Sequence, residues 1–107
     1  SNDKGISWSS PECLGICGSP PHFLLHSSGA LIMTYGKRTG LMGEYAMISY
    51  DNGKTFGEEI QLCEAFDGDL GYPSTVELSD GSLLTVYYQK VKGDRYCSIL
   101  YTKWKLN

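Results

Sequence analysis

The chain has 107 residues, a formal net charge of −3 and an apolar content of 41%. A chain of this length normally forms one domain with a modest core, and its composition excludes intrinsic disorder. No basic cluster is present to bind phosphates, and no apolar segment approaches the ~20 residues of a membrane helix, so we expect neither nucleic acid nor a membrane span. Glycine (13) and tyrosine (8) are abundant. Helical spacing of apolar residues is lacking, which favours an all-β protein with many turns.

The predicted elements begin with a turn at SNDKGISW, residues 1–8, and a strand in the remainder of residues 1–20. Strands follow at about 22–27 and 30–37, joined by a two-residue turn at Ser28-Gly29. A third strand at about 44–50 leads through the turn SYDNGKTF, residues 49–56, to a fourth at about 58–63. The pattern then returns with strands at about 74–79, 82–90 and 95–104, the first two joined by a turn at Asp80-Gly81.

Two segments of the chain repeat each other. PHFLLHSSGALIMTYGKR begins at Pro21, and PSTVELSDGSLLTVYYQK begins at Pro73, 52 residues later. A period near 50 in an all-β chain indicates a stacked or radial repeat. Each copy reads as an antiparallel meander, and four such strands form one blade of a β-propeller. The sequence therefore predicts antiparallel four-stranded meander blades.

The two octapeptides form a second repeat, with the pattern S-x-D-x-G-x-[ST]-[WF] at an interval of 48 residues. The Asp accepts hydrogen bonds from the amides of its own turn, and the Gly takes a backbone conformation that other residues resist. The hydroxyl residue ties the turn, and the aromatic ring fills the space between sheets. The matching residues are Ser1, Asp3, Gly5, Ser7 and Trp8, and Ser49, Asp51, Gly53, Thr55 and Phe56.

Four cysteines raise the question of zinc or disulfides. Cys13 and Cys17 are spaced C-x3-C, but no second pair or suitable histidine follows, so we expect no metal site. A Cys13–Cys17 disulfide requires the loop between the two residues to fold back. The cysteines therefore do not indicate whether the protein lies in an oxidising or a reducing compartment. Cys63 and Cys97 lie in apolar strand patterns and are interpreted as small core residues.

The octapeptide resembles the Asp box, or bacterial neuraminidase repeat, of the sialidase family, and the resemblance extends from Ser1 to about Trp104. It implies about two blades of a six-bladed sialidase-like propeller. Residues 1–20 hold an Asp-box turn and the last strand of a preceding blade, and residues 21–66 form a complete blade. Residues 67–107 form a final blade that lacks its fourth strand, as in a C-terminal fragment. Asp boxes also occur in propellers that are not sialidases.

The resemblance also implies candidate site residues. Tyr72 precedes a strand running into Glu-Leu and a Gly turn, as the nucleophilic tyrosine of sialidases does, although Pro73 stands where the family often has a small hydroxyl residue. A tyrosine is the nucleophile of sialidases, an exception among glycosidases. Arg38 is the candidate ligand of the substrate carboxylate, and Asp69 is a further residue facing the ligand. The alternatives are that Tyr72 packs at a blade entrance and that Arg38 and Asp69 are solvated loop charges.

Two functions follow from these observations. One is the C-terminal part of an exo-α-sialidase acting on sialylated or related glycans, inactive as this fragment because only two arginines, Arg38 and Arg95, are present. The other is a non-catalytic propeller segment that binds glycan or protein. Neither requires a cofactor or metal. Open sheet faces predict association with the rest of a propeller or with copies of the chain, three of which supply about six blades. The residues carry no signal peptide, and a sialidase would be secreted or on the cell surface.

Overall fold

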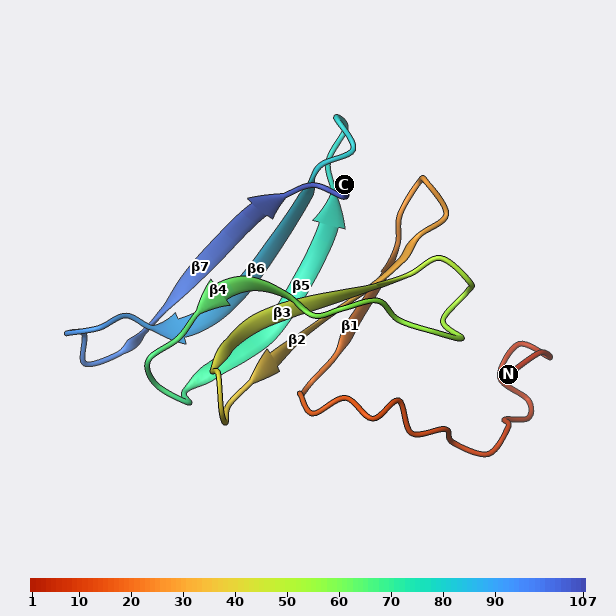
Figure 1. Ribbon diagram of the computed structural model, residues 1–107, viewed down its shortest axis with the longest axis horizontal. Coiled ribbons are helices and arrows are strands. Elements are labelled where there is room, and N and C mark those ends of the chain that lie inside the picture. The colour runs from red at the N-terminus through yellow and green to blue at the C-terminus, as the bar shows by residue number, and fades with distance from the viewer.

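The computed structural model describes residues 1–107 and contains seven β-strands and no helix. Their bounds are β1 (His22–Leu25), β2 (Leu31–Lys37), β3 (Gly43–Ser49), β4 (Ile60–Glu64), β5 (Leu70–Glu77), β6 (Leu83–Lys90) and β7 (Cys97–Trp104). They form two antiparallel sheets, sheet A in the order β1-β2-β3-β4 and sheet B in the order β5-β6-β7. Each sheet is a simple meander, and the predicted all-β class and antiparallel pairing are confirmed (Figure 1).

The two hairpins that open the sheets have the same loop, which is one residue longer than predicted. The amide of His26 donates to the carbonyl of Ala30 at 2.9 Å, and that of Gly29 donates to His26 at 2.8 Å. Leu78, Gly81 and Ser82 repeat this pair of bonds in sheet B. Gly29 and Gly81 have φ values of +88° and +73°. Each loop is therefore a three-residue turn closed by a left-handed glycine, and the predicted two-residue turn is wrong.

The sheets pack face to face, with β5 lying against β1, β2 and β3 (Figure 1). Buried threonine hydroxyls link the layers, since Thr75 Oγ1 lies 3.1 Å from that of Thr34 in sheet A and 2.9 Å from that of Thr85 in sheet B. Trp104 Nε1 donates to Thr85 at 2.9 Å. Each buried hydroxyl thus has a partner, which avoids the cost of an unpaired polar group between the sheets.

Two histidines join the sheets at one edge of this interface. His22 Nδ1 accepts the amide of Thr75 at 3.3 Å, and His26 Nε2 lies 3.3 Å from a carboxylate oxygen of Glu77. The same carboxylate accepts bonds from the hydroxyl of Ser27 and, at 2.8 Å, from its amide. Both imidazoles therefore have structural partners across the interface.

Residues 9–21 form no strand, so the strand predicted within residues 1–20 is absent from this structure. The segment runs alongside sheet A (Figure 1), where Ile16 packs against the cluster of Met33, Tyr35 and Tyr45. Gly18 lies so close to the Tyr35 ring that a Cβ there would be 2.1 Å from a ring carbon. A strand needs a partner strand beside it, and no edge of either sheet pairs with this segment.

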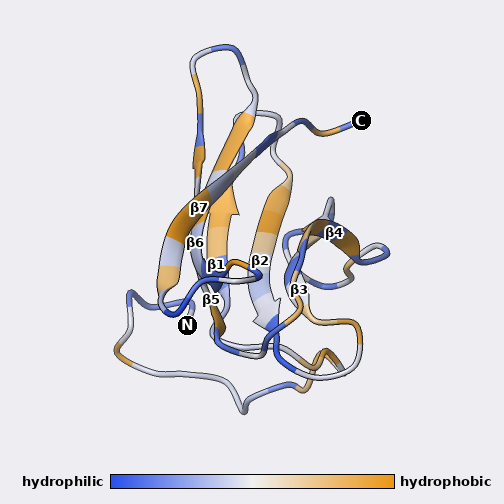
Figure 2. Ribbon diagram, turned by 90° about the vertical axis from the view of Figure 1, so that its left-hand side faces the viewer, coloured by the Kyte–Doolittle hydropathy of each residue, from blue (hydrophilic) through white to orange (hydrophobic).

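The four cysteines are free. Cys63 is half-buried, but Cys97 is exposed on β7, so the prediction of a core position is wrong for Cys97. Its strand lies at the edge of sheet B, where nothing covers the outer face. The same face exposes Val76, Val86, Ile99 and Tyr101, and β7 carries a hydrophobic stretch in Figure 2. Sheet B thus has one covered and one open apolar face.

Candidate functional site

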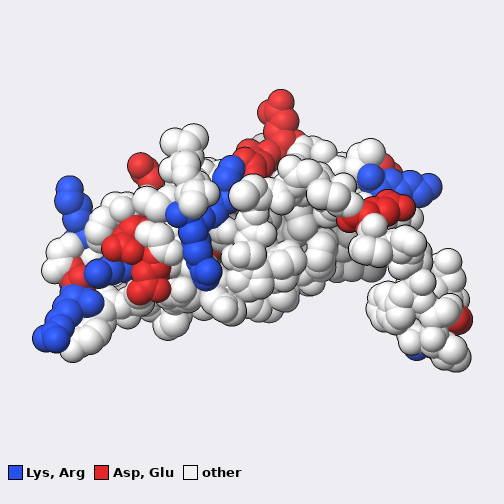
Figure 3. All heavy atoms as spheres, turned by 90° about the horizontal axis from the view of Figure 1, so that it is seen from below, with Lys and Arg blue, Asp and Glu red and all other residues white.

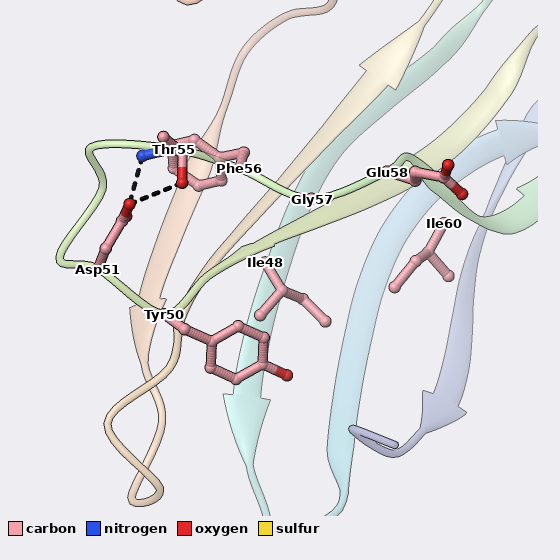
Figure 4. Close-up of a pocket in the computed structure, with 8 residues that line it drawn as sticks. All are labelled: Ile48, Tyr50, Asp51, Thr55, Phe56, Gly57, Glu58 and Ile60. Carbon is pink, nitrogen blue, oxygen red and sulfur yellow. Dashed lines mark hydrogen bonds between the residues drawn. The ribbon is translucent and has the colours of Figure 1, made fainter.

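The two octapeptides fold into turns with the same hydrogen bonds. Asp51 Oδ1 accepts the amide of Thr55 at 2.9 Å, and Oδ2 accepts its hydroxyl at 2.6 Å (Figure 4). Asp3 accepts the amide and hydroxyl of Ser7 at 2.9 and 2.5 Å. The first serine of each pattern receives the amide of the glycine, at 2.7 Å in one turn and 2.8 Å in the other.

These hydrogen bonds lower the pKa of Asp3 and of Asp51 to about 2. The bond from the hydroxyl of Ser7 or Thr55 has the largest effect, and the bond from the amide of the same residue has the next largest. Residues four and five of each pattern have positive φ, 59° and 89° in the first turn and 61° and 83° in the second. Only the second turn joins two strands, β3 and β4, and its Phe56 packs against the core of sheet A. Trp8 of the first turn is exposed, so the prediction that this ring fills a space between sheets is wrong for Trp8.

Tyr72 lies within β5, not ahead of a strand as predicted, because the strand begins at Leu70. The pairing with β6 shifts between Gly71 and Ser74, so Tyr72 sits in a β-bulge. Its φ of +53° is unusual for a residue with a bulky side chain. The bulge leaves the phenol 64% exposed. Backbone strain of this kind is frequent at functional sites, although it does not by itself define one.

Arg38 follows β2 and reaches across to the start of β5. Its Nε donates to the carbonyl of Leu70 at 3.1 Å, and its guanidinium carbon lies 5.8 Å from the centre of the Tyr72 ring. A Cβ on Gly71 would lie 3.2 Å from an Arg38 Nη, so the glycine leaves room for the guanidinium. Sheet packing therefore brings Arg38 and Tyr72 together, although 34 residues separate them.

Tyr88 and Asp69 lie in the same cluster. The Tyr88 ring is 5.9 Å from that of Tyr72. Burial raises the pKa of Tyr88; the charge of Arg38 opposes this rise, and the Asp69 carboxylate adds to it. Arg38 and Asp69 therefore both act on one phenol, and the cluster presents a cation, an anion and two phenols. Asp69 itself is exposed, and its carbonyl accepts the amide of Lys90.

Glu44 was not predicted as a site residue. It lies on β3 opposite Gly36, is fully buried, and neither carboxylate oxygen has a hydrogen-bond partner. Burial raises its pKa to about 7, and the positive charge of Arg38 works against the rise. The signal in the sequence was a lone acid in an apolar strand, on the same face as Ala46.

The site cluster and the second Asp box lie at opposite ends of the sheets. Arg38 follows the end of β2, whereas the Asp51 turn follows the end of β3, which runs antiparallel to β2. A hollow of about 610 Å³ lies beside the Asp51 turn and is lined by Ile48, Tyr50 and Ile60 among others (Figure 4). It gathers no set of reactive groups, so we place the candidate site at the Arg38–Tyr72 cluster instead.

The other arginine does not join this cluster. Arg95 lies in the loop before β7, with its guanidinium carbon 5.4 Å from the Tyr96 ring. Viewed from below, acidic and basic side chains are interspersed, with no large area of one sign (Figure 3). No three His, Cys, Asp or Glu residues are grouped to hold a metal ion. None of the chain forms a helix with the length and apolar character to cross a membrane.

Comparison of the chain with models of known protein families, with curated proteins and with solved structures gave no match. The site is therefore described by its own geometry: an exposed phenol in a strained bulge, with a guanidinium held beside it.

Proposed function

We propose that this chain forms two neighbouring blades of a sialidase-like six-bladed propeller and contributes to the site of an exo-α-sialidase. The observation that carries the proposal is the position of Arg38 beside the exposed phenol of Tyr72. The two Asp-box turns of equal geometry support the fold assignment, as do the two meanders packed face to face.

The chemistry of a sialoside suits a phenol and a guanidinium. Its anomeric carbon carries a carboxylate, which repels a carboxylate nucleophile, whereas the neutral phenol of Tyr72 meets no such repulsion. The planar guanidinium of Arg38 pairs with the substrate carboxylate through two hydrogen bonds. At present its Nε is held by the carbonyl of Leu70, which leaves the Nη groups for a ligand.

In the proposed reaction Tyr72 Oη attacks the anomeric carbon, and the bond from that carbon to the glycan oxygen breaks. A base takes the phenolic proton, an acid protonates the departing oxygen, and water then releases the sugar and restores the phenol. No hydrogen-bonded carboxylate is available at Tyr72 within this chain, so we assign the base and the acid to other blades. The 107-residue chain alone should therefore not hydrolyse sialosides.

The test is turnover of a fluorogenic α-sialoside by the complete gene product that contains this chain. Tyr72→Phe should reduce kcat by on the order of 10³ or more. Arg38→Gln should reduce kcat/KM about 10- to 100-fold, the value of a charge-assisted hydrogen bond. The matched controls are Tyr96→Phe and Arg95→Gln, because that pair has the same ring-to-guanidinium arrangement in the loop before β7, outside the Arg38–Tyr72 pair. Unchanged turnover with Tyr72→Phe would refute the nucleophile.

A second function is favoured by one observation. The chain has two arginines, and Arg95 lies against Tyr96 in the loop before β7, whereas sialidases use three arginines on the carboxylate. A non-catalytic propeller that binds a glycan or a protein needs no such triad. Sialoside binding without turnover by the complete product, weakened by Arg38→Gln, would select this alternative.

A further inference from the structure

We propose that the isolated chain assembles head to tail, so that the open face of sheet B packs on sheet A of a second copy and residues 12–17 of that copy complete sheet B as its fourth strand. The inference rests on the blade arrangement of the proposed function, but not on the chemistry of Tyr72. The open surface is the outer face of sheet B, where Ile99 and Tyr101 are 75% and 70% exposed.

The internal repeat shows what this face should contact. Tyr35 of β2 corresponds to Tyr87 of β6, and their partners in the next strand are Tyr45 and Leu100. This fixes the correspondence of β3 with β7, so Glu44 corresponds to Ile99 and Ala46 corresponds to Tyr101. Glu44 and Ala46 lie on the face of sheet A that packs against sheet B. The open face of sheet B is therefore the counterpart of a face that is already an interface.

The outer side of sheet A fits this face in the same way. It carries Met33, Tyr35 and Tyr45, which Ile16 and Phe56 help to bury, and exposed Phe23 and Leu25 lie on the same side. Tyr35 and Tyr45 correspond to Tyr87 and Leu100, which line the inner side of sheet B. The two outer sides of one molecule thus repeat the two sides of its internal interface. Contact between them is heterologous, and such contacts form a ring when the rotation closes.

The segment before β1 corresponds to β4. The second Asp box leads into β4, and the first leads, at the same interval of 48 residues, into residues 12–16. β4 lies over sheet B, since the carbonyl of Leu62 accepts the hydroxyl of Thr102 at 3.3 Å and that of Glu64 accepts Gln89 at 2.8 Å. The segment takes the same place over sheet A, with Ile16 against the Tyr35 cluster.

Sheet B has three strands, and its β7 has a free edge. In sheet A the corresponding edge of β3 is occupied by β4, and beyond the strands Ala65 donates its amide to the carbonyl of Met42 at 3.0 Å. Met42 corresponds to Cys97, and Ala65 corresponds to Cys17. In the proposed contact, Cys97 of one copy therefore lies opposite Cys17 of the next. Directly opposed residues of antiparallel strands have Cα atoms about 4.5–5.5 Å apart, which a disulfide spans.

The mass of the purified chain, measured by sedimentation equilibrium, tests the assembly. With two sheets per chain, a six-bladed ring predicts three times the chain mass of 11.8 kDa. Ile99→Asp should give a monomer with unchanged circular dichroism, because the side chain is exposed within one copy. Leu41→Asp is the control: this equally exposed side chain lies in the turn after β2, outside the strands of both sheets, and should keep the mass of three chains.

Oxidation with diamide, which accepts the two thiol hydrogens, tests whether Cys17 of one copy lies opposite Cys97 of another. Non-reducing gels of the wild type should show linked chains, and peptide mapping should find Cys17 joined to Cys97. Cys17→Ser should abolish this link, and Cys13→Ser should retain it. A monomer, an open filament, or a link that persists in Cys17→Ser overturns the proposal. None of these outcomes changes the sialoside assay of Tyr72→Phe, so the two proposals fail separately.

Discussion

Glu44 offers the sharpest test of the interface between the sheets. Its carboxyl is fully buried with no hydrogen-bond partner, and burial raises its pKa from an ordinary value near 4.5 to about 7. We predict that Glu44→Gln, which keeps the shape and removes the titration, stabilises the protein above pH 7. It should have little effect at pH 5, where the native carboxyl is protonated and neutral.

The direction of this pH dependence of stability follows from proton linkage. Between pH 4.5 and 7 the folded state binds more protons at Glu44 than the unfolded state, so its contribution to stability falls as the pH rises through this window. Above pH 7 the full cost of the buried charge is present. This rise in the pKa corresponds to at most about 3.5 kcal/mol of stability, at about 1.4 kcal/mol for each pKa unit. The gain from Glu44→Gln at pH 8 should approach this limit.

Urea unfolding at pH 5, 6, 7 and 8 measures the effect, and the control is Glu58→Gln, which removes an exposed carboxylate. The wild type and Glu58→Gln should lose stability across this range, and Glu44→Gln should lose much less. A carboxyl-carbon NMR titration of Glu44 should also shift upward in Arg38→Gln, because Arg38 favours the charged form. Equal pH dependence of the wild type and Glu44→Gln would refute the reasoning.

Three further predictions concern single elements. Asp51→Asn should lower the urea midpoint at pH 7, and the loss should shrink as the pH falls from about 4 through 2, because the native carboxylate becomes protonated only around its pKa of about 2; Asp3→Asn should leave the midpoint unchanged, because its turn is exposed and packs on neither sheet. Gly71→Ala should cost about 1–3 kcal/mol in urea unfolding, since its φ is +129° and a Cβ meets the guanidinium, whereas Gly81→Ala, with open space around it, should cost about 1 kcal/mol. Thr75→Val should cost about 1–3 kcal/mol in the same assay, because it leaves the buried Thr34 hydroxyl without a partner and removes one of the two partners of the Thr85 hydroxyl; a cost below about 0.5 kcal/mol would contradict the proposed linkage.

The positions of the strands could be predicted from the sequence because their signals are local. Apolar runs between turn residues located six of the seven strands to within a few residues, whereas β5 was predicted to begin at residue 74 and starts at Leu70. That error arose because Gly71 and Tyr72 adopt bulge geometry, which no period-two pattern describes. The length of the loops between β1 and β2 and between β5 and β6 depends on which amide and carbonyl close each loop. The glycine in each loop did not by itself determine that pair.

The rest depended on partners distant in the sequence. We expected a strand in residues 9–21 because they follow the first octapeptide turn, but pairing requires a free edge that this chain does not place beside them. Glu44 was missed because alternation predicts that it shares a face with Ala46, but not which face another sheet covers. The approach of Arg38 to Tyr72 arose from packing between sheets, and the resemblance to sialidases had suggested both residues without their contact.

The location of the Asp51 turn at the far end of the sheets from Arg38 and Tyr72 has a consequence for how such a molecule changes over time. Insertions or replacements in the loops after β2 and β4 would alter the candidate site without touching the hydrogen bonds of the turn that joins β3 to β4. Conversely, loss of those bonds would weaken the turn while leaving Arg38 and Tyr72 in the sequence. Substitutions at the two ends of the sheets should therefore accumulate independently of each other.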